Sequence, residues 1–122
     1  MTEPGFSGKR VLVAGASEGV GRETALLFAA EGATVLAVAR NTVRLDALKA
    51  EADGKVVAIA GDLTDEDFVD HLAAETGHVD VLVNIAGRTA HAPFLDSDPK
   101  IWRAAWELNV FALLRLSQAI AR

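Results

Sequence analysis

A glycine-rich segment between an apolar run and a helical run is the strongest chemical signal in the sequence. Gly15, Gly19 and Gly21 directly follow the apolar run Arg10–Ala14 and precede the helical run Arg22–Phe28. Glycines let backbone N–H groups approach a pyrophosphate closely, and the helix N-terminus adds a favourable partial charge. The alternative is a tight turn that uses glycine for geometry alone, but the position between a strand and a helix favours phosphate binding. The candidate phosphate contacts are Gly15, Ser17, Glu18, Gly19, Val20 and Gly21.

A second signal lies where the next apolar run ends, at Arg40 and Asn41. In dinucleotide-binding folds a residue about 20 positions after the glycines contacts the adenosine ribose. No carboxylate stands there to accept a hydrogen bond from a ribose 2′-hydroxyl, whereas the planar guanidinium of Arg40 suits a 2′-phosphate. The pattern therefore favours NADP(H) over NAD(H), with Arg40 and Asn41 as candidate contacts. The alternative is a solvated arginine at a strand end.

The elements that must position these residues alternate along the chain. Three further apolar runs each follow a glycine that ends a helical stretch: Ala33–Val38, Lys55–Ala60 and His78–Val83. Apolar strands that alternate with helices are typical of a parallel sheet covered on both faces. We therefore expect an α/β Rossmann-type three-layer sandwich, with four parallel strands in the order 3-2-1-4 and two helices on each face.

Helix starts are marked by capping residues. Asn41 can cap the helix that follows it, and Asp98 followed by Pro99 is typical of the start of a last helix. Thr64 with Asp67 resembles a capping box, which predicts Thr64 as the cap of the third helix. The last helix has little polar face, so one side should pack on the sheet and the other needs a further layer or a second subunit.

The order of short motifs resembles the short-chain dehydrogenase/reductase family. The glycine spacing Gly-x-x-x-Gly-x-Gly is similar to that family's motif, with Ala14 in place of its threonine. Asp62 and Leu63 resemble the pair beside the adenine ring, and Asn84-Ile85-Ala86-Gly87 resembles the family's Asn-Asn-Ala-Gly. The resemblance implies cofactor contacts at Asp62, Leu63, Asn84, Ala86 and Gly87.

The family resemblance also implies hydride transfer between a nicotinamide and a carbonyl or alcohol carbon. Asn109 matches the helix asparagine that holds a proton-relay water in the family; the alternative is a packed helix asparagine. Relatives with arginine at the position of Arg40 tend to prefer NADP, although many of these also carry a basic residue where Glu18 stands. The family's remaining catalytic groups are a serine and a Tyr-x-x-x-Lys pair, and this sequence contains no tyrosine.

We therefore expect residues 1–122 to be a single nucleotide-binding domain, truncated before the catalytic Ser and Tyr-x-x-x-Lys. Three hypotheses remain: an NADP(H)-binding half that is inactive alone, an enzyme completed by a second half, or an assembly unit that no longer binds nucleotide. The resemblance and an unpaired fourth strand both imply a homodimer or higher oligomer, through the last helix, the strand edge or both.

Composition argues against nucleic acid, a metal ion or a membrane as a binding partner. The 122 residues carry a net charge of −5, which argues against a nucleic-acid partner. The sequence has no cysteine, no metal-ligand spacing among its three histidines and no apolar run long enough for a membrane span. His71 and His78 are expected at the surface, and His91 lies in a loop near the expected substrate side. We expect a cytoplasmic protein that binds neither metal, membrane nor nucleic acid.

Overall fold

The computed structural model describes residues 5–87 and 92–122. Its strands β1 (Arg10–Ala14), β2 (Thr34–Ala39), β3 (Val56–Ala60) and β4 (Val81–Asn84) form one parallel sheet. Their order in space is β3-β2-β1-β4, as the sequence predicts. Because the chain passes from β3 to the far side of β1 before it enters β4, the switch point of the sheet lies between β1 and β4.

Strand β4 begins three residues later than the sequence predicts. The carboxylate of Asp80 accepts the N–H of Arg10 at 2.8 Å, and the Arg10 Nε donates to the carbonyl of His78 at 2.8 Å. Before Val81 the Asp80 carboxylate thus takes the N–H of Arg10, while the N–H of Asp80 donates to the carbonyl of Arg10 at 2.8 Å. The side chain of His78 is 77% exposed and that of His71 is 69% exposed, as expected for both.

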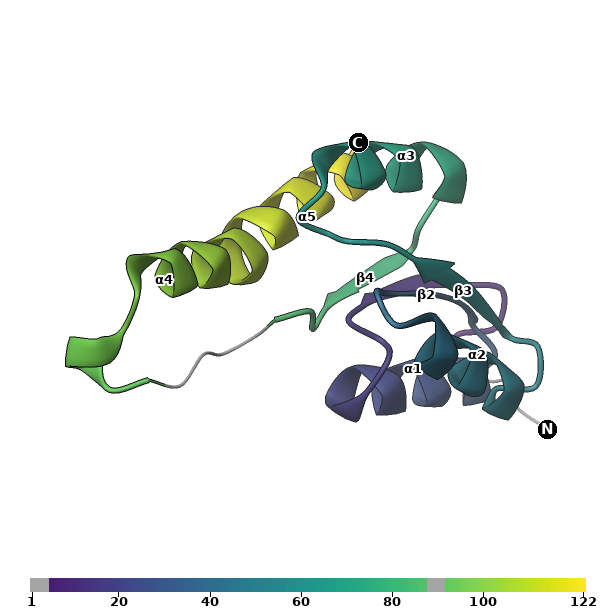
Figure 1. The fold of residues 1–122 in the computed structure, drawn as a ribbon. Coiled ribbons are helices and arrows are strands. Elements are labelled where there is room, and N and C mark those ends of the chain that lie inside the picture. Colours follow the sequence, from purple (N-terminus) through teal and green to yellow (C-terminus); the bar gives the residue numbers. More distant parts are fainter. Residues whose placement is uncertain (1–4, 88–91) are drawn as a thin grey trace.

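Two helices cover each face of the sheet (Figure 1). Helices α1 (Gly19–Ala30) and α2 (Thr42–Glu51) pack on the face that carries Val11 and Val13. Helix α3 (Glu66–Thr76) and the C-terminal helix α5 (Leu113–Ala121) pack on the opposite face, which carries Leu12 and Val38. The three-layer arrangement predicted from the apolar strands is confirmed.

Two of the three predicted helix caps are present, and one is wrong. Asn41 Oδ1 accepts the N–H of Arg44 at 3.0 Å, and Asp98 Oδ1 accepts the N–H of Lys100 at 2.8 Å. Helix α3, however, is capped by Asp65, whose Oδ1 accepts from the backbone of Asp67 at 3.0 Å. The hydroxyl of Thr64 instead donates to Asp62 Oδ1 at 2.7 Å, so it is already engaged on the other side of the loop.

The last helix is a rod of three parts. A short 3₁₀ turn, η1 (Phe94–Asp96), precedes α4 (Pro99–Trp106), which continues through the π-helical segment η2 (Glu107–Ala112) into α5. Ala112 and Leu116 are buried against the sheet, whereas every residue of α4 is exposed or half-buried. In Figure 1 helix α4 extends beyond the sheet. The prediction that one side packs on the sheet therefore holds for the α5 end alone.

Candidate functional site

The predicted site residues meet at the carboxyl ends of the four strands. Ala14 of β1 is in register with Val38 of β2 and with Asn84 of β4. Ala39 is in register with Ala60 of β3. The segments that follow these residues therefore lie along one edge of the sheet, at the switch point where ligands bind in open α/β folds.

The glycine turn is locked by backbone contacts. Gly15 has φ +94°, and its N–H donates to the carbonyl of Val38 at 2.9 Å. A Cβ on Gly15 would lie 2.5 Å from the backbone nitrogen of Ala86, and a Cβ on Gly21 would collide with the carbonyl of Gly15. These two glycines are thus required for the close approach of β1, the loop after β4 and helix α1.

The middle glycine of the turn faces open space. Gly19 has φ +58°, and a Cβ there would have no heavy atom within 4 Å among the described residues. Glu18, at the N-cap of α1, has extended backbone, and its carboxylate accepts from Arg44 rather than from the helix N–H groups. Val20 is exposed and Ser17 is half-buried. The N-terminus of α1 is therefore accessible to an anion, since its dipole is not met by a capping side chain.

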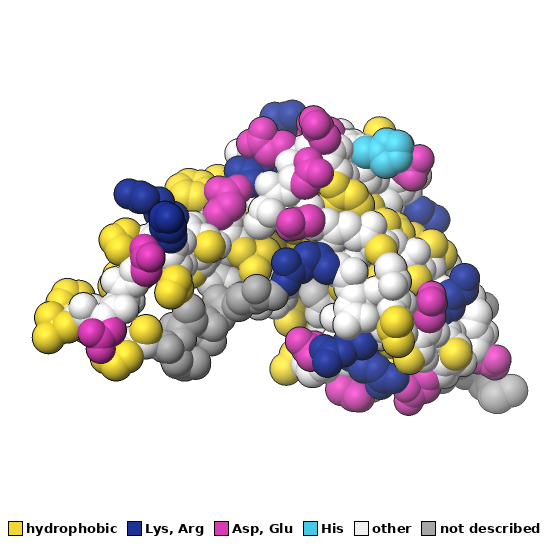
Figure 2. Space-filling model, viewed as in Figure 1, with side chains coloured by type: hydrophobic (Ala, Val, Ile, Leu, Met, Phe, Trp, Pro, Cys, Tyr) yellow, Lys and Arg dark blue, Asp and Glu magenta, His cyan; other side chains and the backbone are white. Residues whose placement is uncertain are grey.

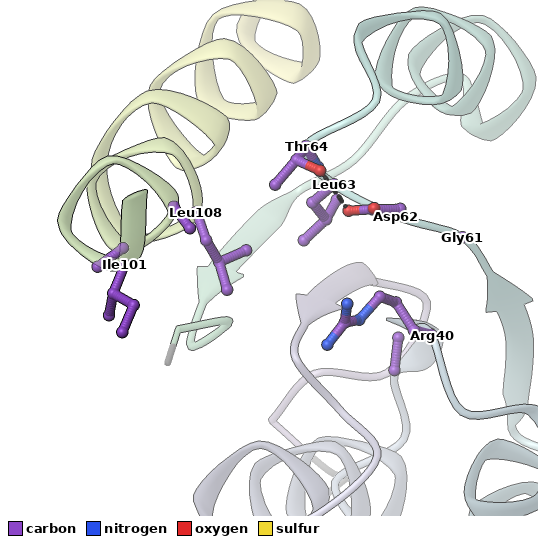
Figure 3. A pocket seen from close by; sticks show the side chains of 10 residues that line it. Arg40, Gly61, Asp62, Leu63, Thr64, Ile101 and Leu108 are labelled. Carbon is purple, nitrogen blue, oxygen red and sulfur yellow. Dashed lines mark hydrogen bonds between the residues drawn. The ribbon is translucent and has the colours of Figure 1, made fainter. Parts of the chain in front are cut away.

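A cavity of about 410 Å³ opens between the segments that follow β2 and β3 and the C-terminal rod. Figure 3 shows Arg40 on one side, the loop Gly61–Thr64 above it, and Ile101 and Leu108 on the helix opposite. Most of its lining is apolar, with the cation of Arg40 and the carboxylate of Asp62 as its charged groups. Such a cavity can hold a flat apolar ring beside a polar or charged substituent.

The pKa of Asp62 lies below its ordinary value. The hydroxyl of Thr64 and then its backbone N–H donate to the carboxylate, which favours the charged form, and the positive charge of Arg40 adds to this. Asp62 is therefore ionised at neutral pH and stands ready to accept hydrogen bonds. Leu63, beside it, is 5% exposed and belongs to the core.

Two predicted contacts are engaged in holding the fold. The side chain of Asn41 caps α2, as described above. The Nδ2 of Asn84 donates to the Oγ of Ser117 at 2.9 Å, and that Oγ donates to the carbonyl of Leu113 at 2.7 Å. Asn84 thus joins the end of β4 to α5, and its amide faces the helix layer.

Asn109 lies in the π-helical segment, beside the loop that follows β4. A Cβ on Gly87 would lie 2.8 Å from Asn109 Oδ1. The N–H groups of Ile85 and Ala86 both donate to the carbonyl of Ala14, at 2.9 and 2.8 Å. The structure therefore brings Asn109, Ala86 and Gly87 to the end of β1. π-helical turns are rare and often occur at functional sites.

Some site residues were missed by the sequence reasoning. Arg44 forms an ion pair with Glu18 of the turn, and Thr64 holds Asp62. Ile101, Ala105 and Leu108 form the helix wall of the cavity. No local sequence pattern distinguishes these residues as members of a site.

Three further expectations concern a metal site, a membrane span and His91. Within residues 5–87 and 92–122, no three His, Asp or Glu side chains gather closely enough to hold a metal ion. No helix in the same ranges is long and apolar enough to cross a membrane. His91 lies outside the described residues.

Comparison with known proteins shows which family of proteins the chain is similar to. A family model described as short chain dehydrogenase matches residues 9–122. The chain is 37% identical over 118 residues to L-xylulose reductase of Mesocricetus auratus, an alignment that covers 97% of this chain and 48% of that protein. It is 35% identical over 117 residues to carbonyl reductase (NADPH) 2 of Sus scrofa, covering 96% of this chain and 48% of that protein.

The solved structures agree. A short-chain dehydrogenase from Streptomyces avermitilis is 42% identical, with a TM-score of 0.87 over 94% of this chain and 44% of that one. The chain therefore belongs to the short-chain dehydrogenase family, whose members use nicotinamide dinucleotide cofactors. It spans about half the length of the curated relatives it matches.

Proposed function

We propose that residues 1–122 form one nucleotide-binding domain that binds NADP(H) in preference to NAD(H). The observation that carries this proposal is Arg40, which directly follows β2 and lines the cavity between the strand ends and the C-terminal rod. The residues Ala39, Arg40 and Asn41 offer no carboxylate for a ribose 2′-hydroxyl. One relative is named for NADPH, which favours the same choice.

In this proposal each part of the cofactor has its own residues. The pyrophosphate lies over the turn that contains Gly19, where the N-terminus of α1 is accessible. The adenosine occupies the cavity between Arg40 and Leu63, and Asp62 accepts hydrogen bonds there. When bound, the cofactor supplies or accepts a hydride. A Cβ on Gly87 would lie 2.8 Å from Asn109 Oδ1, so this glycine lets the loop after β4 approach Asn109, which holds a proton-relay water in this proposal.

The expected preference for NADP(H) can be expressed as a free-energy difference. A hydrogen bond between a guanidinium and a phosphate is worth about 1.5–3 kcal/mol, which is roughly ten- to a hundredfold in the dissociation constant. We expect a calorimetric titration to show NADP⁺ binding more tightly than NAD⁺ by a factor in this range. Arg40→Ala should remove most of that difference and leave NAD⁺ binding nearly unchanged.

Arg103→Ala is the matched control, because Arg103 is also exposed but lies on α4, away from the lining of the cavity. Equal losses for both cofactors in Arg40→Ala would contradict the role given to Arg40. If the folded wild-type chain binds neither cofactor, the proposal fails, and the chain is better described as an assembly unit that keeps the fold without the nucleotide.

For the reaction, we propose hydride transfer between a nicotinamide and a carbonyl or alcohol carbon. The proton must move locally at the same time, and the described cavity holds no tyrosine because the sequence has none. A second segment would then supply the serine, tyrosine and lysine. We expect the chain alone to bind cofactor without oxidising NADPH, and a complementary second half to restore the oxidation.

A further proposal is that the chain forms a homo-oligomer. Its support is an apolar surface on the C-terminal rod, where hydrophobic side chains gather over η1 and α4 (Figure 2). Phe94, Trp102 and Trp106 are each more than half exposed. Among the described strands β4 pairs with β1 alone, so its outer edge is also free. Light scattering at micromolar concentration tests this, and a monomer would overturn it.

A further inference from the structure

An ion pair links the glycine turn to the start of the second helix. Arg44, in the first turn of α2, donates from its Nη1 to the Glu18 Oε2. The backbone of Arg44 is held by Asn41 Oδ1 at 3.0 Å, which fixes the turn from which its side chain leaves. Both side chains are accessible, at 52% and 71% exposure. Arg44 therefore spans the rim between the turn after β1 and the loop after β2.

This rim lies where a ribose 2′-phosphate is expected. Arg40 and Asn41 end the β2 side of the site, and Arg44 follows them within the first helical turn. The other cation near the start of α1 faces elsewhere, because Arg22 is paired with Glu51 at the far end of α2. Arg44 is thus the next cation after Arg40 that a phosphate at this rim would meet.

The charges at the rim are already balanced without a ligand. The positive charge of Arg40 acts on Asp62, and Arg44 is paired with Glu18. A phosphate monoester carries a charge of about −1.5 to −2 at neutral pH, which one guanidinium cannot neutralise. A second cation would therefore favour its binding, whereas the Glu18 carboxylate would repel it and compete for Arg44.

We propose that Arg44 is a second determinant of NADP(H) specificity and that Glu18 weakens this specificity by holding Arg44. In the ligand-bound form the Arg44 guanidinium donates to the 2′-phosphate instead of to Glu18. This inference rests on the proposed binding of NADP(H), and it deepens that proposal by naming the residues that tune the choice of cofactor.

The test is a double-mutant cycle with Glu18→Gln, Arg44→Gln and the double variant, titrated with NADP⁺ and with NAD⁺. The quantity compared is the ratio of the two dissociation constants, since any general effect on the turn cancels in it. We expect Glu18→Gln to raise the preference for NADP⁺ roughly three- to tenfold, and Arg44→Gln to lower it by a similar factor. Glu23→Gln is the matched control, because it removes the same charge from the exposed side of α1.

The decisive comparison is Arg44→Gln in the Glu18→Gln background. If Arg44 contacts the phosphate, its loss still lowers the preference for NADP⁺ when no carboxylate is left to neutralise. An unchanged ratio there would overturn the proposal, as would a Glu18→Gln effect no larger than that of Glu23→Gln. A folded wild-type chain that binds neither cofactor, or prefers NAD⁺, would overturn the proposed function itself, so the two failures are distinguishable.

Discussion

Gly15 and Ala86 approach each other so closely that a Cβ on Gly15 would lie 2.5 Å from the Ala86 nitrogen. Two N–H groups after β4, those of Ile85 and Ala86, donate to the carbonyl of Ala14, one residue before Gly15. The glycine turn is therefore fastened to the loop after β4 as well as to β2. The geometry of the glycine turn depends on this contact between segments about 70 residues apart in the chain.

Substitution of Gly15 should lower the free energy of unfolding more than substitution of Gly19, which faces open space. Gly15→Ala meets both a positive φ and the Ala86 backbone, so we expect a loss of more than about 2 kcal/mol in the free energy of unfolding. Gly19→Ala meets a positive φ but open space, so we expect about 1 kcal/mol. Urea denaturation of the two variants measures the difference, and equal losses would contradict the contact.

The cap of α3 gives a second stability test. Asp65→Ala removes the acceptor for the N–H groups of Asp67 and Phe68, and we expect a loss of about 1 kcal/mol in the free energy of unfolding. Asp70→Ala, an exposed site in the middle of the same helix, is the control and should change little. A loss in Asp65→Ala no larger than that in Asp70→Ala would contradict Asp65 as the capping residue.

The strand order and layers could be predicted because they follow from patterns that are local in the sequence. Apolar runs such as Arg10–Ala14 alternate with helices, and crossover connections then allow few strand orders. The glycine spacing likewise predicted where backbones approach, because a Cβ at Gly15 or Gly21 has no room. These features depend on chain geometry, which the residue types specify directly.

Side-chain pairing could not be predicted in the same way. Arg44 and Glu18 stand 26 residues apart, and nothing in their neighbours distinguishes this pair from other pairs of opposite charge. Thr64 and Asp65 are adjacent and both able to cap a helix, so only the competing bond from Thr64 to Asp62 decides between them. Which side chain forms a given hydrogen bond or ion pair depends on which of its possible partners are already engaged elsewhere in the fold.

The hydrogen bonds to Asp62 predict a dependence of stability on pH. Because Thr64 and then Arg40 favour the carboxylate, the pKa of Asp62 is lower in the folded state than in the unfolded chain. Its contribution to stability is then present above the unfolded value, near 4, and is lost as the pH falls through the lower folded value.

Thermal unfolding of wild type and Asp62→Asn over this pH range should show the effect. We expect the wild type to be more stable at neutral pH and the gap to narrow as the pH falls below about 4. A gap for Asp62→Asn that is constant down to acid unfolding would contradict the lowered pKa.

The apolar surface of the C-terminal rod predicts that self-association depends on Trp106. Trp106 is 56% exposed, whereas Trp102 is tied to Ser97 by a 2.6 Å hydrogen bond from its Nε1, so Trp106 is the cleaner site to change. If a second copy covers this surface, Trp106→Glu places a charge in an apolar contact and should raise the dimer dissociation constant at least about tenfold.

The controls separate an effect on association from an effect on folding. The melting temperature of Trp106→Glu, measured where this variant and the wild type are both monomeric, should change little because the Trp106 side chain is half exposed in one chain. Arg103→Glu makes a charge change one turn away and is the control. If both variants and the wild type show the same mass in sedimentation equilibrium, the rod is not the interface, and the free edge of β4 becomes the surface to test.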